Sequence, residues 1–68
     1  MAMSLAMILE RKLKERHMTK AEFARRVGIS DTSVSRYILD GTIPRYPVLK
    51  RMSEVLECPF DELLKGCL

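Results

Sequence analysis

The sequence is poor in the residues that build catalytic and metal sites. It contains one histidine, two cysteines, no tryptophan and only three glycines in 68 residues. His17, Cys58 and Cys67 lack the spacing of a zinc site, and the chain has neither a glycine-rich phosphate loop nor a nucleophile with an activating base. We therefore expect no enzyme, no metal site and no cofactor. Both cysteines are expected to be free thiols, because no export signal is evident.

Long apolar runs and clusters of aromatic residues are also missing. The apolar stretch at residues 1–9 is far shorter than the roughly 20 residues of a membrane span, and no basic segment precedes it as in a signal peptide. Phe23, Tyr37 and Phe60 are most simply core residues, so no aromatic platform for single-stranded nucleic acid is expected. These absences favour a cytoplasmic protein without a membrane anchor.

What is present is the composition of a small helical globule. Hydrophobic residues make up 47% of the chain and charged residues 31%, helix formers dominate, and no strand-like alternation occurs. A chain of this length buries only about 60% of its unfolded surface, which is enough for one core. We predict an all-α fold with a single domain over residues 1–68.

Positive charge is concentrated in the first part of the chain. Residues 1–51 carry eleven lysines and arginines against five acidic residues, whereas residues 52–68 carry one against four. The first part therefore has a net charge of +6 and the second a net charge of −3. This asymmetry favours an anionic partner for the first part, although ordinary solvated helix faces also produce such counts.

A serine cap and a leucine stripe predict a first helix over residues 5–16. Ser4 precedes it as the cap. Its apolar stripe recurs every four residues, at Leu5, Leu9 and Leu13. Met3 and Met7 lie opposite the stripe, so they either form a contact surface for another protein or are simply exposed.

Two short helices follow, separated by Gly28. Thr19 and Glu22 make a capping-box signature that opens the first of them. Ser30 is suited to cap the second, over residues 31–39. The predicted buried sides are Phe23, Ala24 and Val27 in the first and Val34, Tyr37 and Ile38 in the second.

The remaining residues predict two more helices. Residues 41–47 are interpreted as a linker, after which a fourth helix begins near Pro47. Pro59 fits the first turn of a fifth helix, which Gly66 is expected to end. The predicted apolar sides are Leu49, Met52, Val55 and Leu56 in the fourth helix and Phe60, Leu63 and Leu64 in the fifth.

The second and third helices together form a helix-turn-helix pattern, in which the later helix can enter the DNA major groove. At about 100° per residue, Thr32, Ser35 and Arg36 lie opposite the apolar side of the third helix. Short hydroxyl side chains allow close approach to base edges, and an arginine can bind guanine through two parallel hydrogen bonds. The sequence therefore predicts a surface that reads DNA bases.

Nearly the whole chain resembles the phage-repressor and Cro-like helix-turn-helix regulators, also called the xenobiotic-response-element family. The resemblance depends on the stretch MTKAEFARRVGISDTSVSRY, in which Ala24, Gly28 and Val34 stand at the small, turn and buried positions of the family motif. It implies a compact five-helix lambda-repressor-like fold and a transcriptional regulator, of the phage or bacterial repressor type, that binds double-stranded DNA. It further implies the side chains that face the bases, namely Asp31, Thr32, Ser35 and Arg36. By the same resemblance, Lys20 contacts a phosphate.

Three positions depart from the usual family pattern. Lys20 stands where many members carry glutamine, and lysine still reaches a phosphate. His17 stands where a helix-ending glycine is common, and histidine is among the residues enriched in the left-handed conformation. Gly41 follows Arg36 one residue later than in many members, so the third helix is expected to run longer. Leu39 is then expected to pack on the linker, with contact to a thymine methyl as the alternative.

Several polar residues have both a structural and a DNA-binding interpretation. Ser30 is expected to act first as a helix cap and only second as a phosphate contact. Asp31 either complements the helix dipole or accepts a hydrogen bond from a cytosine amino group. Arg45, Tyr46 and Lys50 either touch backbone phosphates or are simply solvated.

The last helix offers a candidate dimer surface, which the family resemblance favours. Its members are Phe60, Leu64, Cys67 and Leu68. A homodimer would matter because one short helix reads few base pairs, whereas two copies about 34 Å apart read half-sites one DNA turn apart, as in a palindromic operator.

A protein-interaction module is the competing hypothesis. In an antitoxin or adaptor the same helices bind a protein, and DNA binding is secondary. The surface at Met3 and Met7 and the acidic C-terminal part of the chain motivate this alternative.

Overall fold

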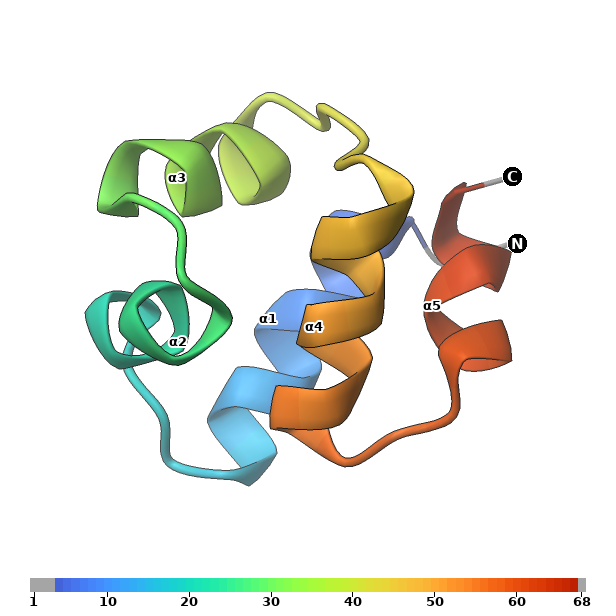
Figure 1. Ribbon diagram of the computed structural model, residues 1–68, viewed down its shortest axis with the longest axis horizontal. Coiled ribbons are helices and arrows are strands. Elements are labelled where there is room, and N and C mark those ends of the chain that lie inside the picture. The colour runs from blue at the N-terminus through green and yellow to red at the C-terminus, as the bar shows by residue number, and fades with distance from the viewer. Residues whose placement is uncertain (1–3, 68) are drawn as a thin grey trace.

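Five helices account for most of residues 4–67, the part of the chain that the computed structural model describes (Figure 1). They are α1 (Leu5–Glu15), α2 (Lys20–Val27), α3 (Asp31–Leu39), α4 (Tyr46–Leu56) and α5 (Phe60–Cys67). No strand occurs within this part of the chain. The predicted all-α, five-helix fold is thus confirmed.

Hydroxyl side chains start the first three helices, as predicted. The side-chain oxygens of Ser4, Thr19 and Ser30 each accept a hydrogen bond from the backbone N–H three residues later, at 3.3, 3.1 and 3.1 Å. Each bond satisfies one of the N–H groups that the first turn of a helix leaves without a partner. α4 starts without such a cap: Arg45 makes no side-chain capping bond, and Pro47 lies in the first turn, where its missing N–H is not needed.

Residues with a left-handed backbone end four of the helices or lie just beyond their ends, including Gly41, at φ 72°, after α3. Gly28, at φ 90°, caps α2, and Glu57, at φ 52°, caps α4. His17 has φ 52° and follows α1, where glycine is more usual. Its N–H donates to the Lys14 carbonyl at 3.2 Å, and the next N–H donates to the Leu13 carbonyl at 2.9 Å, which is the Schellman pattern. The left-handed conformation expected for histidine is therefore present.

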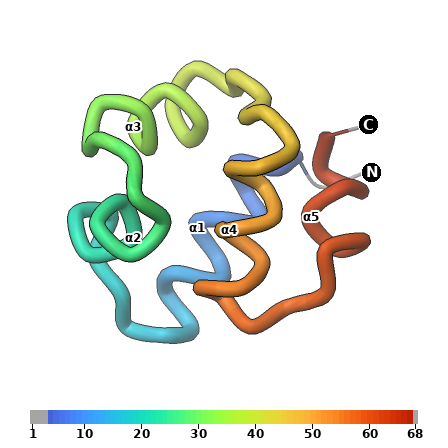
Figure 2. The backbone as a smooth tube through the Cα atoms, in the orientation of Figure 1, coloured from blue at the N-terminus to red at the C-terminus, as the bar shows by residue number. Residues whose placement is uncertain are grey.

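In the view of Figures 1 and 2, α1 and α4 overlap at the centre, one behind the other. α2 and α3 lie together on one side of this pair, with α3 packed against α1 and α2 against α4. α5 lies on the other side and packs against both central helices. The two helices of the helix-turn-helix pattern are thus held by their inner sides, which leaves their outer sides to solvent.

The core draws on all five helices. Its buried apolar side chains are Leu5, Ile8, Leu9, Leu13, Phe23, Ala24, Val27, Val34, Ile38, Leu49, Met52, Leu56 and Leu63. The predicted apolar sides supply most of this set. Tyr37, Val55 and Phe60 are only partly buried against it, and Leu64, which was predicted on the apolar side of the fifth helix, is 37% exposed. Ser53 is also buried, and its hydroxyl donates to the Lys50 carbonyl at 2.7 Å, so its polar group is satisfied.

Two predictions about the C-terminal half are wrong. Gly66 does not end the last helix but lies within α5, since its backbone does not take the left-handed conformation of a helix-ending glycine. Its missing side chain instead lets α5 approach the backbone of Leu5. Tyr46 was expected in the linker, yet it is the first residue of α4. A proline is tolerated anywhere in the first turn, so Pro47 allows the helix to begin one residue earlier.

The acidic end of the chain is joined to α1 by ion pairs. Glu62 of α5 lies 2.9 Å from Lys12 and 4.0 Å from Arg11, and Glu57 lies 3.1 Å from Arg16. The hydrogen bond from Lys12 is the main cause that lowers the pKa of the Glu62 carboxyl below its ordinary value. Part of the charge asymmetry in the sequence is therefore neutralised within the fold.

Candidate nucleic-acid interface

A turn of three residues joins α2 to α3. Gly28 has φ 90°, and both its N–H and that of Ile29 donate to the Ala24 carbonyl, at 2.8 and 2.9 Å. A Cβ atom added at Gly28 would meet nothing within 4 Å. Glycine is needed here for its backbone conformation and not for lack of space. This turn sets the direction in which α3 leaves α2.

α3 has a packed side and an exposed side. Val34 is fully buried and Ile38 is 6% exposed, and these residues hold the helix against α1 and α2. Thr32 and Arg36 are exposed on the other side, and Ser35 is half-buried between the two sides. The structure thus brings the three predicted polar residues together on one accessible side of α3.

The start of α3 is occupied by hydrogen bonds within the helix. The hydroxyl of Ser30 accepts from the Ser33 N–H at 3.1 Å and also forms a hydrogen bond with the Ser33 hydroxyl at 3.0 Å. Ser30 therefore serves as a cap, in agreement with its favoured interpretation. Asp31 is exposed in the first turn, where a negative charge complements the positive end of the helix dipole.

Leu39 does not pack on the linker, which corrects the expectation from the sequence. Its side chain is 71% exposed, whereas Pro44 is the linker residue that is buried. The longer last turn of α3 is the reason. The Thr42 N–H donates to the Arg36 carbonyl six residues earlier at 3.3 Å, whereas the corresponding bond after α2 spans five residues. The linker crosses the end of the helix and leaves the outer side of Leu39 uncovered.

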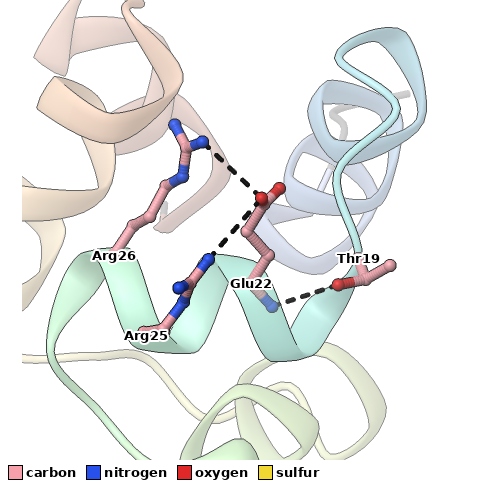
Figure 3. Close-up of polar contacts among 4 residues, drawn as sticks. All are labelled: Thr19, Glu22, Arg25 and Arg26. Carbon is pink, nitrogen blue, oxygen red and sulfur yellow. Dashed lines mark hydrogen bonds and ion pairs between the residues drawn. The ribbon is translucent and has the colours of Figure 1, made fainter.

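Two arginines of α2 are paired with a carboxylate on the same helix. Glu22 lies 3.7 Å from Arg25 and 3.6 Å from Arg26, and its backbone N–H donates to the Thr19 hydroxyl (Figure 3). The sequence signature predicted a capping box, and its threonine half is present. The Glu22 carboxylate extends to the arginines, which are its neighbours three and four residues later on a helix.

A second group of cations is exposed and lacks such partners. Within residues 4–67 its members form no ion pair with a carboxylate, and they are Lys14, Lys20, Arg36, Arg45, Lys50, Arg51 and Lys65. These side chains can meet an anion without losing an existing ion pair. All four cations that the sequence assigned to DNA, Lys20, Arg36, Arg45 and Lys50, belong to this group.

α4 is held to its neighbours along both flanks. The Tyr46 ring packs edge-on against Phe60 of α5, with ring centroids 5.2 Å apart, although Tyr46 is 61% exposed. On the other flank the Arg51 guanidinium donates to the Arg26 carbonyl at 3.3 Å, close to the C-terminal end of α2. Sequence reasoning missed Arg51, because its partner is 25 residues away and no local spacing links them. This bond helps to hold α2 in place beneath α3.

The candidate dimer surface on α5 is only partly described. Leu64 is 37% exposed, and Phe60 and Cys67 are half-buried. Leu68 lies outside the described residues, as does Met3 on the other candidate surface, where Met7 is 55% exposed.

Both cysteines are free thiols, as expected. Burial raises the pKa of the Cys58 thiol and that of the Cys67 thiol above their ordinary values. Neither thiol is therefore activated as a nucleophile. Within residues 4–67, histidine, cysteine and acidic side chains nowhere gather in threes to hold a metal ion. No helix in this span has the length and apolar character needed to cross a membrane.

The fold and this interface define a helix-turn-helix protein. A helix-turn-helix family profile matches residues 9–63, and the chain belongs to this family, of the Cro/C1 type. Family and fold are those of DNA-binding regulators, which are typically not enzymes.

Two solved structures of the P22 c2 repressor are similar to the chain. The nuclear magnetic resonance structure of its DNA-binding domain is 26% identical with a TM-score of 0.89, over 100% of this chain and 90% of that one. The crystal structure of the P22 c2 repressor with synthetic operator 9T is 27% identical with a TM-score of 0.85, over 93% and 96% of the two chains. No curated protein sequence matches the chain.

Proposed function

We propose that this protein is a sequence-specific, double-stranded DNA-binding transcriptional repressor that inserts α3 into the major groove of its operator. The observation that supports this proposal is that α3 has one packed side and one accessible side. Its apolar side is packed on α1 and α2, and its side with Thr32, Ser35 and Arg36 remains accessible. Membership of the helix-turn-helix family and likeness to a repressor structure with operator DNA support the same function.

The accessible side of α3 is assigned to the bases. The Arg36 guanidinium is suited to donate two hydrogen bonds to the O6 and N7 atoms of a guanine. Thr32 and Ser35 have short side chains, so they allow the helix to approach the base edges closely. The exposed Asp31 carboxylate is suited to accept a hydrogen bond from a cytosine amino group.

The surrounding polar residues are assigned to the phosphates. Lys20 stands at the start of α2, and Arg45, Tyr46 and Lys50 stand at the start of α4. Contacts of this kind carry little sequence information, but they fix the register of the protein on the duplex. Ser30 is a weaker phosphate candidate, because its hydroxyl already bonds to Ser33 twice.

A homodimer on a palindromic operator completes the proposal. Each copy, a single domain over residues 1–68, would read one half-site, and the α5 surface of Phe60, Leu64, Cys67 and Leu68 would join the two. The exposed fraction of Leu64, 37%, leaves apolar area available for such a contact. We place the protein in the cytoplasm, on the nucleoid, and assign it no catalytic step.

Selection of bound duplexes from a random pool tests the function. We expect enrichment of one motif with two-fold symmetry, since two copies related by a two-fold axis read inverted half-sites. The matched control is Arg25→Ala, because Arg25 is an exposed arginine paired with Glu22 and not assigned to a base. This variant should enrich the same motif. No enrichment at moderate salt, together with a stoichiometric protein partner that co-purifies with the chain, would overturn the proposal in favour of an interaction module.

A further inference from the structure

Leu39 is the most exposed of the large hydrophobic side chains that the structure describes, at 71%. Single exposed leucines are common on protein surfaces, so this fraction carries no argument by itself. The position of Leu39 on α3 is the informative observation. It follows Ser35 by four residues and Arg36 by three, so it lies on the same side of the helix, one turn farther along.

The linker that follows α3 leaves the Leu39 side chain uncovered. The Thr42 N–H bonds back to the Arg36 carbonyl at 3.3 Å, which draws the linker across the end of α3. Pro44 is the linker residue that is buried. If α3 enters a major groove with Arg36 at the base edges, as the proposed function requires, Leu39 is carried into the groove with it.

The chemistry of the groove then restricts what Leu39 can contact. A leucine side chain neither donates nor accepts hydrogen bonds, and packing it on a polar base edge would leave donors or acceptors without partners. The one apolar group that the four base pairs present in the major groove is the C5 methyl of thymine. Contact between two apolar groups buries both from water.

We infer that Leu39 determines specificity by contacting the C5 methyl of a thymine in each half-site. The inference depends on the proposed function and names a base within it. Leu39 lies about 4.5 Å beyond Arg36 along the helix axis, at a rise of 1.5 Å per residue. Since base pairs along one strand are about 3.4 Å apart, the thymine belongs about one or two steps from the pair that Arg36 reads.

Deoxyuridine scanning of the selected operator tests the contact, because deoxyuridine differs from thymidine only by the missing methyl. Each thymine is replaced in turn, and the affinities of the wild-type chain and of Leu39→Ala are measured on every duplex. At one thymine per half-site, the replacement should weaken wild-type binding about fourfold, the effect of losing one buried carbon group. The same replacement should leave Leu39→Ala unchanged. At the same position, the wild-type chain should bind 5-methylcytosine paired with guanine more tightly than cytosine paired with guanine, because these two pairs differ only by the methyl, and Leu39→Ala should not distinguish them.

The exposed Ile43 of the linker provides the matched control, at 50% exposure. Ile43→Ala should keep the wild-type sensitivity to deoxyuridine. If both Leu39→Ala and the wild-type chain respond alike at every thymine, the inference is overturned while the repressor function stands. If Leu39→Ala instead weakens self-association in sedimentation, Leu39 belongs to a protein contact and the inference is again overturned. If the wild-type chain enriches no duplex at all, the proposed function and the inference fail together.

Discussion

Gly66 of α5 packs directly on the backbone of Leu5 at the start of α1. A Cβ atom on Gly66 would lie 2.6 Å from the Leu5 Cα and 2.7 Å from its nitrogen. These distances are too short for any side chain, and the obstacle is backbone, which cannot rotate away. The fifth helix therefore reaches the first at a distance that only glycine permits, and the Lys12–Glu62 ion pair joins the same two helices.

We predict that Gly66→Ala destabilises the protein. In an exposed helix interior this change stabilises by about 1 kcal/mol, because alanine is the better helix former. Here the forced shift of α5 should reverse the sign and cost about 1–3 kcal/mol. The loss of stability is measured as the difference in unfolding free energy between the wild-type chain and Gly66→Ala in urea titrations.

Gly28 is the comparison site, because a side chain there is opposed by backbone strain and not by crowding. Its φ of 90° is strained for any side chain, although the space around it is open. Asparagine tolerates the left-handed region, so Gly28→Asn should be milder than Gly28→Ala. No such relief is expected for Gly66→Asn. An unfolding free energy that rises in Gly66→Ala would contradict the crowding argument.

Arg36→Ala should remove discrimination at one base pair. We expect a loss of about 1–3 kcal/mol on the selected operator and a much smaller loss on random duplex, because base contacts specify and phosphate contacts do not. Affinities on both duplexes at one salt concentration are the measurement. Equal losses on the two would remove Arg36 from the reading role.

Lys20→Ala should weaken all duplexes alike. Each phosphate that is neutralised contributes about −0.9 to the slope of log affinity against log salt, so the variant should have a slope shallower by about that amount. Lys20→Arg keeps the charge and should keep the slope. An unchanged slope in Lys20→Ala would show that this residue makes no phosphate contact.

The Glu62 carboxylate should make stability depend on pH. Its pKa in the folded protein is lowered from its ordinary value of 4.5, with the Lys12 hydrogen bond as the first cause. A lowered pKa stabilises the folded state above pH 4.5, and this contribution is lost as the pH falls through the folded value. Wild-type and Glu62→Gln unfolding free energies should therefore differ at neutral pH and converge in acid.

Lys12→Met supplies the control for this dependence. Without the Lys12 ammonium the Glu62 pKa should return toward its ordinary value, so the acid-dependent part of the stability should shrink. A difference between wild-type and Glu62→Gln that stays constant from neutral pH to acid would contradict the ion pair.

The sequence by itself determined where the first three helices begin and most of the residues on their buried sides. Ser4, Thr19 and Ser30 were predictable as caps because a cap bonds to the backbone only three residues later, so the local sequence is enough to identify it. The bounds predicted for the third helix, residues 31–39, agree with α3 for the same reason. The side that carries Thr32 and Arg36 was predictable too, because a helix repeats every 3.6 residues.

Only the tertiary structure decided the features that join distant residues. Gly66 resembles a helix end in sequence, and its contact with Leu5 exists only because α5 folds back onto α1. Arg51 finds the Arg26 carbonyl because α4 lies beside α2. Leu39 is exposed because the linker closes the end of α3 through Thr42 and buries Pro44 instead. The hydrophobic effect is non-directional and stabilises any contact between apolar surfaces. A pattern of residue types therefore does not say which surfaces meet.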